Sequence, residues 1–142
     1  MFHFDFSRLF SSIFIIGTVN FDKMKKLIDH IPIIDVRSRQ DVESKGMLPK
    51  SFNVPVNEIL GQSKAFELSD QEFKLKYGHN KPSKNEYFVI LCTRGVRAKS
   101  VANQLKSLGY SNVIVYPGSF DDWVAKGGFL VNINGGPGTL KI

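Results

Sequence analysis

The feature that most limits the fold of this chain is an alternation of short apolar runs with stretches of helical period. Strand-like runs occupy residues 31–36, 51–55, 87–91 and 113–116. Helical spacing of apolar side chains occurs at 21–28, 69–77 and 98–108. Buried parallel strands are nearly continuous apolar runs, and parallel strands need crossover connections, which are usually helices. We therefore expect an α/β fold in which a central parallel β-sheet is flanked by α-helices on both faces.

The length of the chain fits one domain. Its 142 residues, 42% of them hydrophobic, can form a real core but not two full domains. We expect that domain at residues 18–130, an N-terminal extension at 1–17 that is disordered or a targeting segment, and a loose C-terminal tail at 131–142. The apolar stretch in the extension is too short to cross a bilayer and lacks the pattern of a secretory signal, so we expect no membrane contact.

Charge and cysteine content limit the function. The net charge of +6 favours anionic partners, but the lysines are scattered as on a solvated surface, which argues against nucleic acid. A single cysteine excludes an internal disulfide, and the three histidines lack ligand spacing, so we expect neither a metal site nor a cofactor. A lone thiol fits a reducing compartment. We expect the cytoplasm, with the mitochondrial matrix as the alternative.

That cysteine lies where an α/β fold places its chemistry. Cys92 follows the apolar run 87–91 and precedes a helical pattern, so its sulfur is expected at the carboxyl edge of the sheet, where ligands bind. The loop reads Cys92-Thr93-Arg94-Gly95-Val96-Arg97. Backbone amides, the helix dipole and the two arginines all favour the thiolate, which is the nucleophilic form. Gly95 suits the loop because it allows close backbone approach and positive φ.

This loop predicts sulfur transfer. The Cys92 thiolate could attack the outer sulfur of thiosulfate, expel sulfite and hold a persulfide until an acceptor thiolate removes the sulfur. The structural alternative is that Cys92 is only a small buried hydrophobe, which is the usual role of a lone cysteine after an apolar strand. A purely structural turn has little use for two cations before an amphipathic helix. The constellation therefore favours chemistry.

Two other functions stay open. Cys-based phosphatases cradle a dianion in a similar loop, but they place five residues between the cysteine and the arginine. Cys92 and Arg97 have four between them, so the cradle should be too small for a phosphoryl group, provided that Arg97 closes the loop. A phosphatase or arsenate reductase is thus the less favoured enzyme. A catalytically silent binding module is the other alternative.

Four segments resemble the rhodanese family in the family's own order, over about residues 18–128. They are IIDVRSRQD (33–41), GMLPKSFNVP (46–55), CTRGVR (92–97) and YPGSFDDW (116–123). Within the family, the chain is similar to the small single-domain thiosulfate sulfurtransferases of eukaryotes, including the thiosulfate:glutathione type. Departures from the family pattern are Met47 for His, Lys50 for Gly and Pro117 for Gly. They alter the rim of the pocket and not the nucleophile.

The resemblance implies a rhodanese-like fold and a thiosulfate sulfurtransferase. It implies thiosulfate as sulfur donor and glutathione or thioredoxin, or cyanide, as acceptor. It also implies that Cys92 carries the persulfide, that the amides of Thr93 to Arg97 cradle the sulfur, and that Arg97 closes the loop.

Two residues at the end of the first strand would lie beside this site. We interpret Asp35 as a structural ion-pair partner more than a chemical group, and Arg37 as a candidate for substrate binding. From its charge alone, Arg94 is expected to grip the donor.

Overall fold

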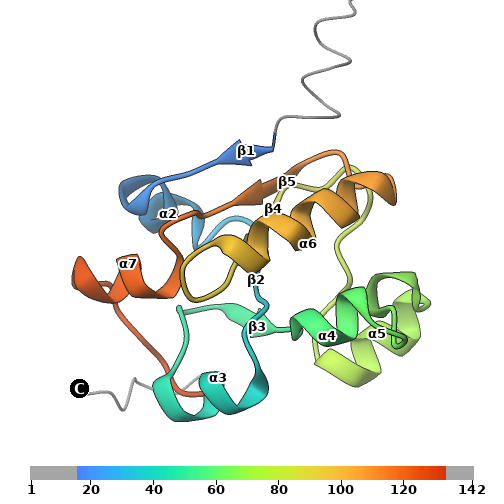
Figure 1. The fold of residues 1–142 in the computed structure, drawn as a ribbon, viewed down its shortest axis with the longest axis horizontal. Coiled ribbons are helices and arrows are strands. Elements are labelled where there is room, and N and C mark those ends of the chain that lie inside the picture. Colours follow the sequence, from blue (N-terminus) through green and yellow to red (C-terminus); the bar gives the residue numbers. More distant parts are fainter. Residues whose placement is uncertain (1–15, 134–142) are drawn as a thin grey trace, which may run out of the picture.

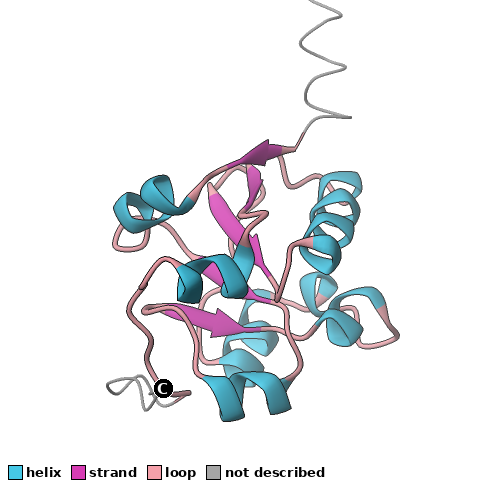
Figure 2. Cartoon of the chain, turned by 60° about the vertical axis from the view of Figure 1, so that its left-hand side comes forward, coloured by secondary structure: helices cyan, strands magenta, loops and turns pink. Residues whose placement is uncertain are grey.

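The computed structural model of the chain describes residues 16–133 and contains a five-stranded sheet between helices (Figures 1 and 2). The strands are β1 (Gly17–Thr18), β2 (Ile33–Asp35), β3 (Ser51–Asn53), β4 (Phe88–Leu91) and β5 (Val113–Val115). Every pair is parallel, and the order is β1-β5-β4-β2-β3. The predicted α/β class and its parallel sheet are confirmed, with each predicted strand shortened by one to three residues.

Six α-helices and one short 3₁₀ helix connect the strands in the described part of the chain. They are α2 (Phe21–Leu27), α3 (Arg39–Lys45), α4 (Val56–Leu60), η1 (Ala65–Glu67), α5 (Asp70–Tyr77), α6 (Val96–Ser107) and α7 (Ser119–Ala125). The sequence predicted α2, α5 and α6 and did not predict α3, α4 or α7. In α3 the reason is plain, because Val42 is the one buried residue in seven and no apolar period forms.

The sheet separates two apolar layers, because successive side chains of a strand point to opposite faces. Phe88 and Ile90 of β4 pack with α4, α5 and α6, whereas Val89 and Leu91 pack with α2 and α7. Figure 1 shows the helices that contribute to these layers. β4, with all four residues buried, is therefore the central strand that the sequence predicted.

Parallel pairing brings two chain segments together at one edge of the sheet. Asp35, the last residue of β2, is in register with Leu91, the last residue of β4. The next residue continues the pairing, since the Val36 N–H donates to the Leu91 carbonyl at 2.9 Å. The segments that follow β2 and β4 are thus neighbours, and both carry candidate site residues.

The ends of the described chain bear on the predicted division into domains. Residues 1–15 of the expected extension and 134–142 of the expected tail lie outside the described residues. Val131, the first residue of the expected tail, forms an isolated antiparallel bridge with Met47. Within residues 16–133, no helix is long and apolar enough to cross a bilayer. The domain boundaries themselves stay a prediction.

Candidate active site

The loop after β4 is shorter than the sequence indicated. β4 ends at Leu91 and α6 begins at Val96, with Gly95 as its N-cap, so Val96 and Arg97 belong to the first helical turn. Gly95 has φ +95°, and a Cβ atom there would lie 2.3 Å from the Pro117 carbonyl oxygen. Both the positive φ and the close approach require glycine, as the sequence predicted.

The sulfur of Cys92 is buried and receives backbone hydrogen bonds. Only 1% of Cys92 is exposed. Its Sγ accepts from the Gly95 N–H at 3.0 Å and from the Ala98 N–H at 3.4 Å. Burial is what the small-hydrophobe interpretation expects, but an apolar role does not call for two amides directed at the sulfur. Fixed N–H donors of this kind stabilise negative charge on the atom they face.

The predicted cradle is only partly the observed one. Of the amides from Thr93 to Arg97, the described contacts give Gly95 as the donor to Sγ, and Ala98 beyond that range is the second donor. Arg97 Nη2 donates to Thr93 Oγ1 at 3.3 Å and so spans the loop, consistent with a closing role. Arg94 is exposed beside the loop. Its grip on a donor stays a prediction.

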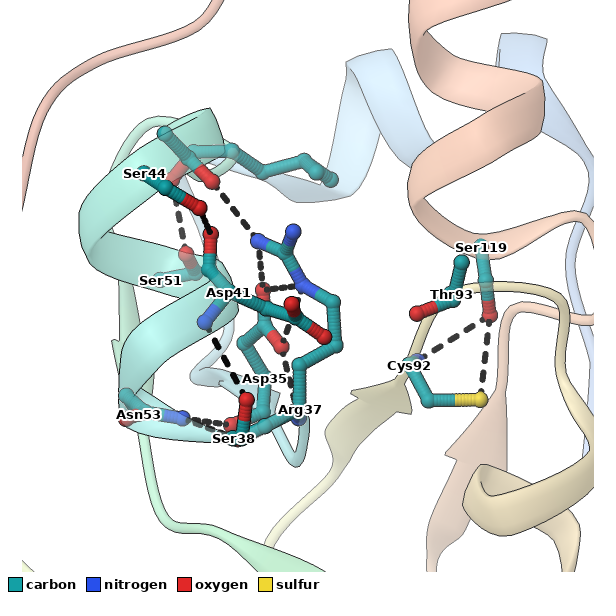
Figure 3. A network of polar contacts seen from close by, with 12 residues as sticks. Asp35, Arg37, Ser38, Asp41, Ser44, Ser51, Asn53, Cys92, Thr93 and Ser119 are labelled. Atoms are coloured by element: carbon teal, nitrogen blue, oxygen red, sulfur yellow. Dashed lines mark hydrogen bonds and ion pairs between the residues drawn. The ribbon is translucent and has the colours of Figure 1, made fainter.

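Ser119 holds the loop from the opposite side, and the sequence did not single it out. It is fully buried with φ +58°, a conformation that costs energy in a residue other than glycine. Its Oγ accepts from the Cys92 N–H at 3.1 Å and donates to the Tyr116 carbonyl at 2.8 Å. Because that bond takes the hydroxyl proton, the 4.0 Å contact from Ser119 Oγ to Cys92 Sγ is weak (Figure 3).

The first turn of α7 binds the loop backbone as well. The Phe120 N–H donates to the Cys92 carbonyl at 3.0 Å, and the Asp121 N–H donates to the Thr93 carbonyl at 3.1 Å. The segment YPGSFDDW therefore positions the backbone of Cys92 although it lies far from this residue in the sequence. The only signal for this role was the resemblance of that segment to the closing motif of the family.

The end of β2 carries a buried ion pair. Asp35 is 0% and Arg37 1% exposed, and Arg37 Nη2 lies 2.8 Å from Asp35 Oδ2. The same Nη2 donates to the Gly46 carbonyl at 2.7 Å, and the guanidinium lies 3.9 Å from the centre of the Phe120 ring. Burial raises the pKa of Asp35, while its contacts with Arg37 oppose that rise. The structural interpretation of Asp35 fits this geometry.

The position of Arg37 bears on its predicted contact with substrate. Its Nη1 is the one guanidinium nitrogen that is buried and has no hydrogen-bond partner among residues 16–133. Figure 3 shows the pair and Cys92 as two separate clusters of contacts. The pair reaches the active loop through Phe120, whose N–H binds the Cys92 carbonyl. Substrate binding by Arg37 stays a prediction.

Candidate metal ligands do not cluster among the residues that the structure describes. No three side chains of His, Cys, Asp or Glu gather there as ligands. The described site offers a cysteine sulfur, backbone N–H donors on that sulfur and exposed cations nearby.

Known proteins resemble this chain in sequence and in fold. A family model described as rhodanese-like domain matches residues 20–126. A mitochondrial thiosulfate sulfurtransferase of Saccharomyces cerevisiae is 37% identical over 112 residues, covering 76% of this chain and 72% of that protein. A thiosulfate:glutathione sulfurtransferase of the same yeast is 32% identical over 117 residues, covering 80% and 81%. The solved structure of a human single-domain sulfurtransferase superposes with a TM-score of 0.72 at 27% identity, covering 78% and 96%.

Proposed function

The chain belongs to the rhodanese-like domain family, and from that premise we propose that it transfers sulfane sulfur through a persulfide on Cys92. The observation that carries this proposal is the pair of backbone N–H groups, from Gly95 and Ala98, on the sulfur of the only cysteine. Relatives named as sulfurtransferases support the reaction class.

The reaction has two displacements. In the first, the Cys92 thiolate attacks the outer sulfur of the donor; a new S–S bond forms, the donor's own S–S bond breaks, and sulfite leaves with the electron pair. In the second, an acceptor thiolate attacks the outer sulfur of the persulfide and the Cys92 thiolate leaves. The two N–H donors stabilise the anionic sulfur at the start and at the end of this cycle.

Thiosulfate is the proposed donor and glutathione the proposed acceptor. Relatives in yeast and in Homo sapiens are named thiosulfate:glutathione sulfurtransferases, at 32% and 29% identity. Arg94, exposed beside the loop, supplies positive charge for a dianion, and Arg97 holds the loop closed through Thr93. Thioredoxin and cyanide are further acceptors to compare. Because two yeast relatives carry the word mitochondrial in their names, the mitochondrial matrix is the proposed location, in place of the cytoplasm.

Intact-mass measurement tests the proposal. Incubation with thiosulfate should add one sulfur atom to the protein and release sulfite. The Cys92→Ser variant should gain no mass and release no sulfite, while its circular dichroism and unfolding midpoint stay close to those of the parent. Retained sulfite release in this variant would refute Cys92 as the nucleophile.

Two outcomes would favour the other functions. An unchanged mass in the folded parent protein would favour a silent binding module. Turnover of an aryl phosphate without sulfite release would favour phosphatase chemistry.

A further inference from the structure

A cleft of about 520 Å³ lies beside the active loop, and the mechanism above uses Arg94 and Gly95 of its lining but assigns it no ligand. It is defined here as the basic cleft, and its lining includes Arg94, Gly95, Val96, Lys99 and Asn103. The last residues of β1 and β5 form the opposite wall, so the cleft opens at the carboxyl edge of the sheet. This volume is in the range that holds small molecules, about 300–1,000 Å³.

One face of α6 supplies the wall next to the loop. Val96, Lys99 and Asn103 are spaced by three and four residues and therefore lie on one side of the helix. Ala98, Val101, Ala102 and Leu105 are buried on the side of α6 that packs on the sheet. Val96 is 76% exposed although it is apolar. This face thus offers an apolar side chain, a cation and an amide in one row.

The charge of the cleft is positive and uncompensated. Arg94 and Lys99 are exposed, and neither side chain has a hydrogen bond or ion pair with any of residues 16–133. Among residues 16–133, no carboxylate lines the cleft. A neighbouring cleft of about 550 Å³, which shares Thr18 and Pro117 with it, is instead lined by Asp22, Asp122 and Lys126, two carboxylates against one cation. An anionic ligand should therefore bind the basic cleft in preference to the neighbouring one.

The basic cleft also adjoins the reacting sulfur. Gly95 lines the cleft, and its N–H lies 3.0 Å from Cys92 Sγ. Sγ itself is nearly inaccessible, but the outer sulfur of a persulfide would extend about 2.05 Å beyond it. A reaction with an acceptor in this cleft therefore requires the outer sulfur, and not Sγ, to face it.

We propose that the basic cleft binds the acceptor thiol, that this acceptor is a small peptide thiol with carboxylates, and that Lys99 determines the preference for it. The proposal rests on the sulfurtransferase function proposed above. Lys99 faces a carboxylate of the acceptor, and Val96 packs against its methylene groups. Arg94 belongs to the loop itself and is shared with the donor, so Lys99 is the residue that distinguishes acceptor from donor.

Steady-state kinetics of charge variants test the proposal. Lys99→Glu should raise the KM for glutathione about fivefold, as expected for replacing one exposed attraction by a repulsion, and Lys99→Gln should raise it less. The KM for 2-mercaptoethanol, which has no carboxylate, should not change. The matched control is Lys45→Glu on α3, which makes the same charge change between β2 and β3, at the opposite end of the strand order from β1.

Several outcomes would overturn the assignment. An equal rise in the KM for 2-mercaptoethanol would mean that Lys99→Glu damages the loop. An unchanged KM for glutathione would mean that the acceptor does not use the cleft. An effect on thioredoxin alone would assign the cleft to a protein partner.

A binding measurement separates this proposal from the sulfurtransferase function. S-Methylglutathione keeps the carboxylates and cannot accept sulfur. It should shift the amide resonances of Lys99 and Asn103 in the parent protein, and these shifts should weaken in Lys99→Glu. If these shifts appear but thiosulfate adds no sulfur to the protein, the cleft binds the peptide and the proposed sulfurtransferase function is wrong. If sulfur adds and no shift appears, the cleft assignment fails alone.

Discussion

The ends of β2 and β4 lie side by side but use charge in opposite ways. After β2, Asp35 and Arg37 are almost fully buried and bind each other. After β4, Arg94 is exposed and has no partner among the described residues. A charge that is neutralised inside the protein supports the fold, whereas a charge left in water is available to a ligand. We therefore expect the β2 end to stabilise the framework of the site and the β4 end to contact the ligand.

The free energy of removing a charge from water explains the difference. A charge removed from water loses several kcal/mol of solvation, so a buried arginine persists only with a close counter-ion and further acceptors. Arg37 has both, in Asp35 and the Gly46 carbonyl. Arg94 pays no such cost, because its guanidinium stays hydrated until an anion arrives. Substitutions at the β2 end should thus change the free energy of unfolding, and substitutions at the β4 end should change the KM for the ligand.

The largest expected effect is on the β2 end. Arg37→Met should lower the free energy of unfolding by about 3–5 kcal/mol, because Asp35 would stay buried without its counter-ion. Urea unfolding at neutral pH measures the change. The double variant Asp35→Asn/Arg37→Met should recover part of the loss, since it buries no charge.

A surface pair is the control for this result. Arg39 contacts Glu58 at 2.9 Å, with 44% of the Arg39 side chain exposed. Arg39→Met should cost less than about 1 kcal/mol. If Arg37→Met costs no more than Arg39→Met, the β2 pair is not the framework that we describe.

The β4 end should show the reverse. Arg94→Ala should raise the KM for thiosulfate about tenfold, the loss of one charge-assisted contact, and change unfolding by less than about 0.5 kcal/mol. Arg94→Lys keeps the charge and should recover most of the affinity. Sulfite release at varied thiosulfate measures both. A loss of stability with an unchanged KM would make Arg94 structural and remove the contrast between the two ends.

The contrast between local and distant signals also explains what the sequence could predict. Cys92 and Gly95 were identified because a strand run, a loop and a helical period follow one another directly in the chain. The Asp35–Arg37 pair was accessible for the same reason, because its two members are only two positions apart in the sequence. Ser119 was not, because its bond to Cys92 joins residues 27 apart and its unusual φ leaves no mark in residue type.

Surface features were harder to predict for another physical reason. The sequence interprets the scattered lysines as solvated, and Lys99 is indeed exposed. Its position in a cleft depends on β1 pairing with β5, which places the wall of Thr18 and Val115 opposite α6. Pairing between strands so far apart in the chain cannot be read from local periodicity. The position of the cysteine loop could therefore be predicted from the sequence, whereas the shape of the surface around it could not.

In α7, the pair of Asp122 and Lys126 is partly exposed, and so lies between the buried pair after β2 and the unpaired Arg94. It gives the smallest predicted effect on stability. The hydrogen bond from Lys126, and then that from Tyr116, hold the pKa of Asp122 below its usual value. A lowered pKa in the folded state gives stability that is present above the unfolded value of about 3.9 and disappears as the pH falls through the folded pKa. Asp122→Asn should therefore lower the free energy of unfolding by less than about 1 kcal/mol at neutral pH, because the Asp122–Lys126 pair is partly exposed. At a pH below the folded pKa of Asp122, the substitution should change the free energy of unfolding by almost nothing. Urea unfolding of parent and variant across this pH range measures the difference. An equal difference at all pH values would mean that Asp122 acts through packing rather than through its charge.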